Sequence, residues 1–243
     1  MSLLDSIITG TAKRPIFAVI YGGPGVGKST LSAGMPEPLM FDFDQGADQI
    51  EGLARIDMAE HDYVDYMDTL YDIEADPQNI GTLIVDTEDK LFPKREQALL
   101  DELKIDHLSA APFGKAYQQL REIHSAEINL LKKIRKKGVH IIILCHAQIK
   151  TINEPHLIGD YQLYTLNIPD KHTALLFEAA DLIGYAHIKT VIKKGAGGNS
   201  GSGMVTGERE LVITPHTGIH AKNRYGAKDN IPLSADALLN LIK

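Results

Sequence analysis

Residues 22–30 carry the most specific chemical signal in the sequence. They read Gly-Gly-Pro-Gly-Val-Gly-Lys-Ser-Thr and match the phosphate-binding pattern G-x-x-x-x-G-K-[ST] at every fixed position. Glycines allow the backbone amides of such a loop to turn toward an anion. We expect Lys28 to contact the β- and γ-phosphates of a nucleotide and Ser29 to offer its hydroxyl to Mg²⁺. The predicted nucleotide-binding residues are Gly22, Gly23, Pro24, Gly25, Val26, Gly27, Lys28, Ser29 and Thr30.

An aspartate that ends an apolar segment is the second chemical signal. Residues 82–86 read Thr-Leu-Ile-Val-Asp, which is typical of a buried strand with Asp86 at its carboxyl end. Ligands of open parallel sheets bind at that edge, and such an aspartate often holds the Mg²⁺ shell. The pattern alone is common, but it is much more specific downstream of a complete phosphate loop. Ser29 and Asp86 are therefore the predicted metal ligands.

Two polar side chains follow a further apolar segment, residues 139–145. His146 and Gln148 are expected at the same edge of the sheet, where either could sense the γ-phosphate. A single histidine is more often structural, so both interpretations of His146 stay open.

A parallel sheet is the element that would bring these residues together. Apolar or β-branched segments predict strands, and amphipathic or capped segments predict helices. The predicted strands are 16–21, 39–44, 82–86, 139–145 and 181–186; the predicted helices are 29–33, 63–73, 93–103, 115–137, 171–180 and 234–241. We therefore predict an α/β fold of one domain, residues 1–243, with a mostly parallel central sheet flanked by helices.

The carboxyl-terminal part differs in kind from the rest. Residues 187–194 and 209–214 alternate polar and apolar side chains around a Gly- and Ser-rich segment, 195–203. We predict a C-terminal antiparallel hairpin extension with a flexible tip at 195–203, followed by a turn-rich region that ends at 226. Residues 149–170 lack clear periodicity and predict an irregular binding loop, and residues 1–14 form a short lead-in.

Composition excludes several functional classes. The formal net charge is −7, so the whole protein does not attract nucleic acid or acidic membranes, and any such contact needs a local basic patch. Cys145 is the only cysteine, which excludes an internal disulfide and suits a reducing cytoplasm. We find no apolar segment of membrane-spanning length and predict no membrane partner. The candidate DNA contacts are Lys150, Lys189, Lys193 and Lys194, although such lysines more often solvate an exposed strand edge.

Taken together, five segments resemble the RecA-like P-loop ATPases, and within them the phage-encoded AAA-type ATPases of the Sak single-strand-annealing group. The resemblance covers most of the chain, and its carriers are residues 22–30, 39–44, 82–86, 141–148 and 221–226. It implies binding of ATP and Mg²⁺, assembly into a homo-oligomeric ring or filament, and contact with single-stranded DNA. It also implies a role in phage recombination or replication, in the cytoplasm of a host bacterium, with a single-strand-binding protein as a further partner.

The same resemblance implies roles for four more residues. The pair Lys222 and Arg224 looks like the Lys-x-Arg finger of the replicative-helicase branch, which would act on ATP held by a neighbouring subunit. RecA-like enzymes activate water with a glutamate at the end of the second strand. This sequence has the shorter Asp44 there, which puts the rate of hydrolysis in question. Glu88, just beyond Asp86, is the other candidate base.

Two other functions use the same loop. One is a nucleotide or small-molecule kinase, which would usually carry an arginine-bearing lid; the arginines here are scattered. The other is a regulatory nucleotide-binding module with very low turnover. Stimulation of ATP hydrolysis by single-stranded DNA would favour the DNA-directed ATPase that the resemblance implies. Phosphate transfer to a small acceptor would favour the kinase. The absence of both effects would favour the regulatory module.

Overall fold

The computed structural model describes residues 14–153, 159–194 and 201–242, of which 191–194 and 201–206 are described by their backbone alone. The strands are β1 (Phe17–Gly22), β2 (Pro38–Asp42), β3 (Ala54–Asp57), β4 (Thr82–Asp86), β5 (His140–Ile152), β6 (Tyr161–Leu166), β7 (Leu182–Lys194), β8 (Gly201–Val212), β9 (Lys222–Asn223) and β10 (Ile231–Pro232). The helices are α1 (Lys28–Ala33), α2 (Tyr63–Ala75), α3 (Glu88–Leu103), α4 (Lys115–Lys136), α5 (Asp170–Ala179) and α6 (Ala235–Asn240). Two 3₁₀ turns, Leu108–Ala110 and Pro112–Gly114, precede α4. Of the predicted lead-in, residues 1–13 lie outside the described residues.

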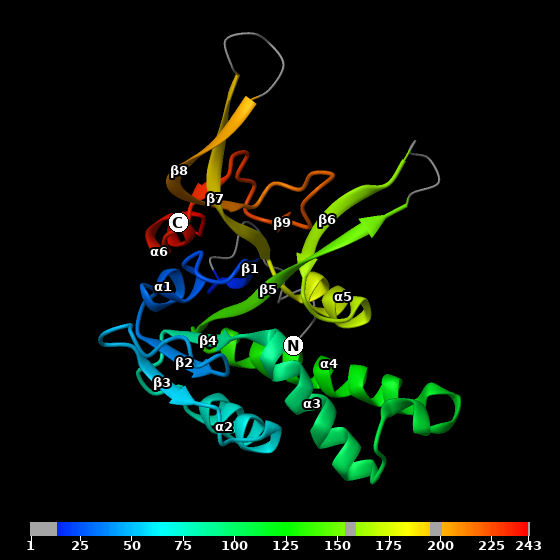
Figure 1. Cartoon of the computed structure of the whole chain (residues 1–243). Coiled ribbons are helices and arrows are strands. Elements are labelled where there is room, and N and C mark those ends of the chain that lie inside the picture. Colours follow the sequence, from blue (N-terminus) through cyan, green and yellow to red (C-terminus); the bar gives the residue numbers. More distant parts are fainter. Residues whose placement is uncertain (1–13, 154–158, 195–200, 243) are drawn as a thin grey trace, which may run out of the picture.

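One ten-stranded sheet runs through the described part of the chain in the order β10-β8-β7-β1-β5-β4-β2-β3, with β6 on β5 and β9 on β7. The central pairs β7–β1, β1–β5, β5–β4, β4–β2 and β2–β3 are parallel. Strands β7 and β8 pair antiparallel and project from the sheet as a long hairpin (Figure 1). The predicted mostly parallel sheet with helices and a C-terminal antiparallel hairpin is therefore confirmed.

Helices cover both faces of the sheet because its central strands are apolar on both sides. In β1, Phe17 and Val19 face one layer of the core, and Ala18 and Ile20 face the other. Figure 1 shows α2, α3 and α4 on the same side of the sheet, while α1 lies near α6. The first face buries side chains of α2 to α5, including Tyr66, Leu99, Leu131 and Leu176; the second buries Leu31 of α1 and Leu238 of α6. Burial on two faces explains the continuous apolar segments of the sequence.

Strand register places the polar residues at one edge. Asp42 lies opposite Asp86, and Gly22 lies opposite both His146 and Ala186. Parallel strands have their carboxyl ends at the same edge, so the loop after β1 and the end of β4 meet there.

The prediction of an irregular loop at 149–170 is wrong. Strand β5 continues to Ile152 and pairs antiparallel with β6, so that Lys150 lies opposite Leu163. The two segments satisfy each other's backbone donors and acceptors, which local periodicity cannot reveal because their partners are distant in sequence. Residues 154–158, between them, lie outside the described residues.

Several element boundaries also differ from the predictions, and the predicted strand 39–44 ends at Asp42. Helix α3 begins at Glu88 instead of 93, with Thr87 at its N-cap and acidic residues in its first turn, and Pro93 lies inside it. The segments predicted separately at 181–186 and 187–194 form one strand, β7. Residues 201–203 of the predicted tip belong to β8, and residues 195–200 lie outside the described part.

Candidate functional site

The phosphate loop joins the buried strand β1 to helix α1, as the motif requires. Gly22 lies so close to β7 that a Cβ added to it would meet the carbonyl oxygen of Ala186 at 2.4 Å. No larger residue fits there without moving a central strand. The start of the loop is therefore fixed against the parallel pair β1–β7.

Lys28 points back into its own loop. Its ammonium donates hydrogen bonds to the carbonyl oxygens of Gly22 at 3.2 Å and Gly23 at 3.0 Å, and the residue is buried. Burial lowers the pKa of Lys28, while the carboxylate of Asp86 acts in the opposite direction. The loop thus holds a positive charge within a few ångströms of the amides that would surround a phosphate.

Ser29 and Asp86 converge from α1 and from the end of β4. The Ser29 hydroxyl donates to Asp86 Oδ2 at 2.5 Å, and the carbonyl oxygen of Asp86 accepts from the backbone N–H groups of Phe43 and Asp44. Burial raises the pKa of Asp86 to about 6, against the effect of the Ser29 hydrogen bond. A hydroxyl and a carboxylate are the hard oxygen donors that Mg²⁺ takes from a protein when substrate phosphates and water supply its other ligands. The two residues therefore fit Mg²⁺, although no group of three or more His, Cys, Asp or Glu among the described residues could hold a metal ion alone.

Asp44 and His146 line the same site. Asp44 follows β2, and its Oδ2 lies 3.9 Å from Nε2 of His146, which belongs to β5. Asp89 holds His146 in place, because its carboxylate contacts the imidazole Nδ1 at 2.9 Å and accepts the backbone N–H of His146 at 2.8 Å. Burial would raise the pKa of Asp89, but these contacts with His146 outweigh it and the pKa is lowered. Asp89 thus orients the ring that faces Asp44.

A cavity of about 270 Å³ lies between these groups. Its lining combines the loop, both acidic residues and one arginine of β8: Pro24, Gly25, Gly27, Lys28, Ser29, Thr30, Asp44, Gly46, Ile50, Asp86, Thr87, His146 and Arg209. Anion-binding amides, a cation and two carboxylates in one cavity suit a polyphosphate with a divalent cation.

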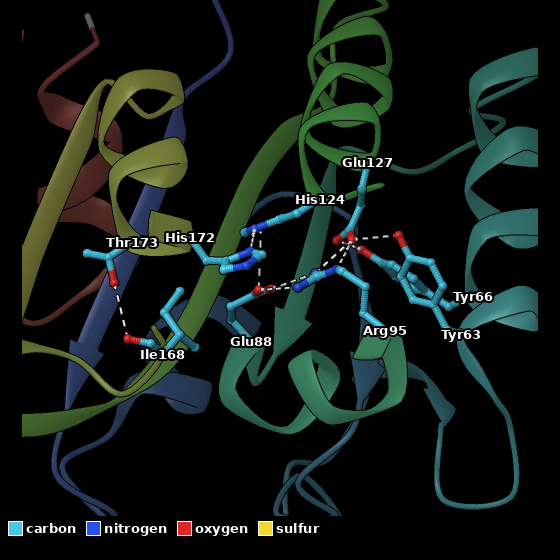
Figure 2. Close-up of polar contacts among 9 residues, drawn as sticks. All are labelled: Tyr63, Tyr66, Glu88, Arg95, His124, Glu127, Ile168, His172 and Thr173. Atoms are coloured by element: carbon cyan, nitrogen blue, oxygen red, sulfur yellow. Dashed lines mark hydrogen bonds and ion pairs between the residues drawn. The ribbon is translucent and has the colours of Figure 1, made fainter. Parts of the chain in front are cut away.

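Glu88 does not line this cavity. It is buried in a cluster of charged and aromatic side chains, where Arg95 Nη1 donates to its Oε1 at 2.9 Å (Figure 2). The other side of the same guanidinium contacts Glu127 at 2.7 Å, and His124 Nε2 lies 3.5 Å from Glu88. The Glu88 carboxylate is thus committed to a buried ion pair with Arg95 outside the cavity lining.

Three other predicted site residues also have partners elsewhere. Gln148 donates through Nε2 to the carbonyl oxygen of Leu166 at 2.5 Å. Lys222 donates to the carbonyl oxygen of Phe177. Arg224 pairs with Asp181 at 3.2 Å. None of the three lines the cavity within this chain.

The candidate DNA-binding lysines differ in what the structure describes. Lys150 contacts the carboxylate of Asp170, and Lys189 lies 3.8 Å from Glu208. Their charges are therefore partly balanced by acidic neighbours. The side chains of Lys193 and Lys194 lie outside the described residues.

Sequence analysis missed two charged residues of the site: Asp89, which holds His146, and Arg209, which lines the cavity. It also missed the cavity residues Gly46, Ile50 and Thr87. Asp89 is three residues beyond Asp86, and a helix that begins at 88 turns it back toward the site; a correct helix start would have indicated it. Arg209 had no such signal, because it is one cation in an alternating strand and only the sheet order brings it to the loop.

A family model described as an AAA domain matches residues 14–225. The match spans most of the chain, including the phosphate loop and the β4 aspartate. The chain belongs to this AAA domain family. Members are generally P-loop ATPases, so family and fold agree on a nucleotide-binding protein of the ATPase type. The comparison with curated proteins gave no match. Among the described residues, no helix combines the length and apolar character that crossing a bilayer requires.

Proposed function

We propose that this AAA-domain protein binds ATP with Mg²⁺ and hydrolyses it. The observation that carries the proposal is the convergence of Lys28, Ser29 and Asp86, with the Ser29 hydroxyl 2.5 Å from the Asp86 carboxylate at the wall of one cavity. Hydrolysis of this kind needs little covalent chemistry from the protein, because positioning and charge stabilisation supply most of the catalysis.

Each residue has a defined part in the proposed reaction. The loop amides and the Lys28 ammonium bind the β- and γ-phosphates. Ser29 and Asp86 hold Mg²⁺, which neutralises charge on the phosphate oxygens when bound. Asp44 orients the attacking water and accepts its proton, since its carboxylate lines the cavity and is about a third exposed (32%). His146, held by Asp89, contacts the region of the γ-phosphate.

We further propose that the activity serves DNA recombination or replication of a phage, in a homo-oligomer. The support is the resemblance to the Sak group and the long β7–β8 hairpin, which offers an extended surface beyond the sheet. In this proposal Lys222 and Arg224 leave their contacts with Phe177 and Asp181 at a subunit interface and reach ATP of a neighbour. Single-stranded DNA and a single-strand-binding protein are the partners.

The test is the rate of ATP hydrolysis with and without single-stranded DNA, together with the particle mass in the presence of ATP. We expect DNA to raise the rate, salt to reduce the DNA effect by counterion release, and ATP to increase the mass. Phosphate transfer to a small acceptor would replace the proposal with a kinase, and binding without turnover would replace it with a regulatory module. A DNA-independent rate in a monomer would contradict the DNA-directed, oligomeric part.

A further inference from the structure

Arg209 is a cation of the cavity wall that has no role in the function proposed above. It lies in β8, opposite Ile188 of β7, and its carbonyl oxygen accepts a hydrogen bond from the N–H of Leu233 at 3.1 Å. The next two residues of β8, Glu210 and Leu211, pair with Pro232 and Ile231 of β10. The backbone of Arg209 is therefore held from both sides, and its side chain is exposed toward the phosphate loop.

The guanidinium of Arg209 lies directly against the open face of Gly27. Gly27 has a φ of 105°, which favours glycine. A Cβ at that position would lie 2.8 Å from Arg209 Nη1 and 3.6 Å from both Cδ and Cζ. The absence of a side chain on the residue before Lys28 thus leaves room for an arginine at contact distance from the loop.

The charge of Arg209 remains available to a ligand. Its two acidic neighbours in β8 have other partners, because Glu210 lies 3.2 Å from His187 and Glu208 lies 3.8 Å from Lys189. Among the described residues, the Arg209 guanidinium itself makes no hydrogen bond or ion pair. The other cation of the cavity lining, Lys28, is bound to carbonyl oxygens of its own loop.

We propose that Arg209 binds the polyphosphate chain of the nucleotide held by the phosphate loop of the same subunit. Its planar guanidinium can donate paired, charge-assisted hydrogen bonds to phosphate oxygens. The inference rests on the proposed nucleotide binding and adds a residue that acts in cis, unlike Lys222 and Arg224. Because Arg209 belongs to β8, the bound phosphate also ties the base of the hairpin to the occupancy of the cavity.

The test compares the affinities of ATP, ADP and adenosine for the unaltered protein, Arg209→Ala and Arg209→Lys by calorimetric titration. We expect Arg209→Ala to weaken ATP and ADP binding by roughly 10- to 100-fold, the range of one or two charge-assisted hydrogen bonds, and to leave adenosine binding within about 2-fold. Arg209→Lys keeps the charge without the fork and should give an intermediate loss. Arg121→Ala is the matched control, because Arg121 lies in α4 and does not line the cavity.

A mixing experiment separates action in cis from action in trans. Combining Arg209→Ala with Lys28→Ala should restore no ATP hydrolysis, because no subunit then has both residues intact. ATP affinity of a folded Arg209→Ala protein equal to that of the unaltered protein would overturn the inference and leave the proposed function standing. A folded, unaltered protein that binds no ATP would overturn both.

Discussion

Asp44 and Glu88 are two acidic residues close in space to Asp86, and the structure gives them different surroundings. Asp44 lines the cavity, with Lys90 at 4.0 Å and His146 at 3.9 Å. Glu88 is buried against Arg95, and burial raises its pKa. Sequence spacing alone could not separate these two candidates, because the direction of each side chain depends on where α3 begins and on what packs against it.

Asp44→Asn should lower ATP turnover by about 100-fold or more and leave ATP bound, because an amide cannot accept the proton of the attacking water. Steady-state hydrolysis and ATP titration measure the two effects separately. Glu88→Gln is the matched comparison and should lower stability more than turnover. If only Glu88→Gln slows hydrolysis in a stably folded protein, the catalytic base has been assigned to the wrong acid.

At the scale of elements, one buried arginine joins three helices. Arg95 of α3 contacts Glu88 of the same helix and Glu127 of α4, and Glu127 accepts hydrogen bonds from Tyr63 at 3.0 Å and Tyr66 at 3.2 Å of α2 (Figure 2). Removing one member of a buried ion pair leaves the remaining charge without compensation. The cluster therefore fixes the helices that cover one face of the sheet.

Arg95→Met should reduce the free energy of unfolding by about 3–5 kcal/mol, because two buried carboxylates lose their counter-charge. Chemical denaturation measures this loss. Lys150→Met removes a surface pair with the exposed Asp170 and should cost less than about 1 kcal/mol. A loss at Arg95 no larger than at Lys150 would contradict the structural role of the cluster.

Two histidines beside this cluster make stability depend on pH. His124 and His172 share a contact between their Nδ1 atoms at 2.9 Å, and they face Arg95, Glu88 and Arg121. Burial, with Arg95 adding to it, lowers the pKa of His172 to about 4 and that of His124 well below its usual range. Since the unfolded chain takes up these protons near pH 6.5, the unfolded state binds more protons as pH falls below that value, and stability decreases.

We expect the free energy of unfolding to fall by roughly 1–3 kcal/mol between about pH 7 and pH 5 through these histidines. Glu88 has a raised pKa, so its protonation makes the folded state more stable as pH falls, opposite to the histidines. The measurement must therefore isolate the contribution of the histidines. Denaturation of the unaltered protein and of the double variant His124→Gln, His172→Gln at both pH values does so. An equal pH dependence in the two proteins would remove the histidines as its source.

Sequence patterns predicted the elements well where burial on both faces of the sheet requires a continuous apolar segment. The predicted strand 82–86 coincides with β4, and the predicted helix 115–137 differs from α4 by one residue. Prediction failed for strands that form only through pairing with a neighbouring strand. Residues 161–166 form β6 because the end of β5 lies beside them, and the mostly exposed β3 depends on its pairing with β2.

At the scale of the whole molecule, the sheet order explains what no local pattern could predict. It places β1 between β5 and β7, so that the loop, Asp86, His146 and Arg209 meet although they span most of the sequence. The predicted finger lies elsewhere: Arg224 contacts Asp181 at 3.2 Å, and Lys222 contacts Phe177. If the finger contributes to hydrolysis, it must do so across subunits or after a rearrangement.

Mixing Arg224→Ala with Lys28→Ala should restore part of the ATPase activity that each variant lacks alone. Some interfaces of a mixed assembly then combine an intact loop with an intact finger, and such a finger can contribute roughly 1000-fold or more to the rate. Mixing Lys28→Ala with Asp86→Asn is the control without recovery, because both changes damage the same cavity. A monomer with a concentration-independent specific rate would eliminate the shared site.

The central claim is that the cavity around Lys28 is a nucleotide site, and Lys28→Ala tests it most directly. Titration of ATP and Mg²⁺ against the folded variant, beside its rate of hydrolysis, is the measurement. We predict loss of ATP binding or a fall in turnover of about 100-fold or more, because the positive charge at the β- and γ-phosphates is removed. Near-normal binding and hydrolysis by a folded Lys28→Ala protein would contradict the account.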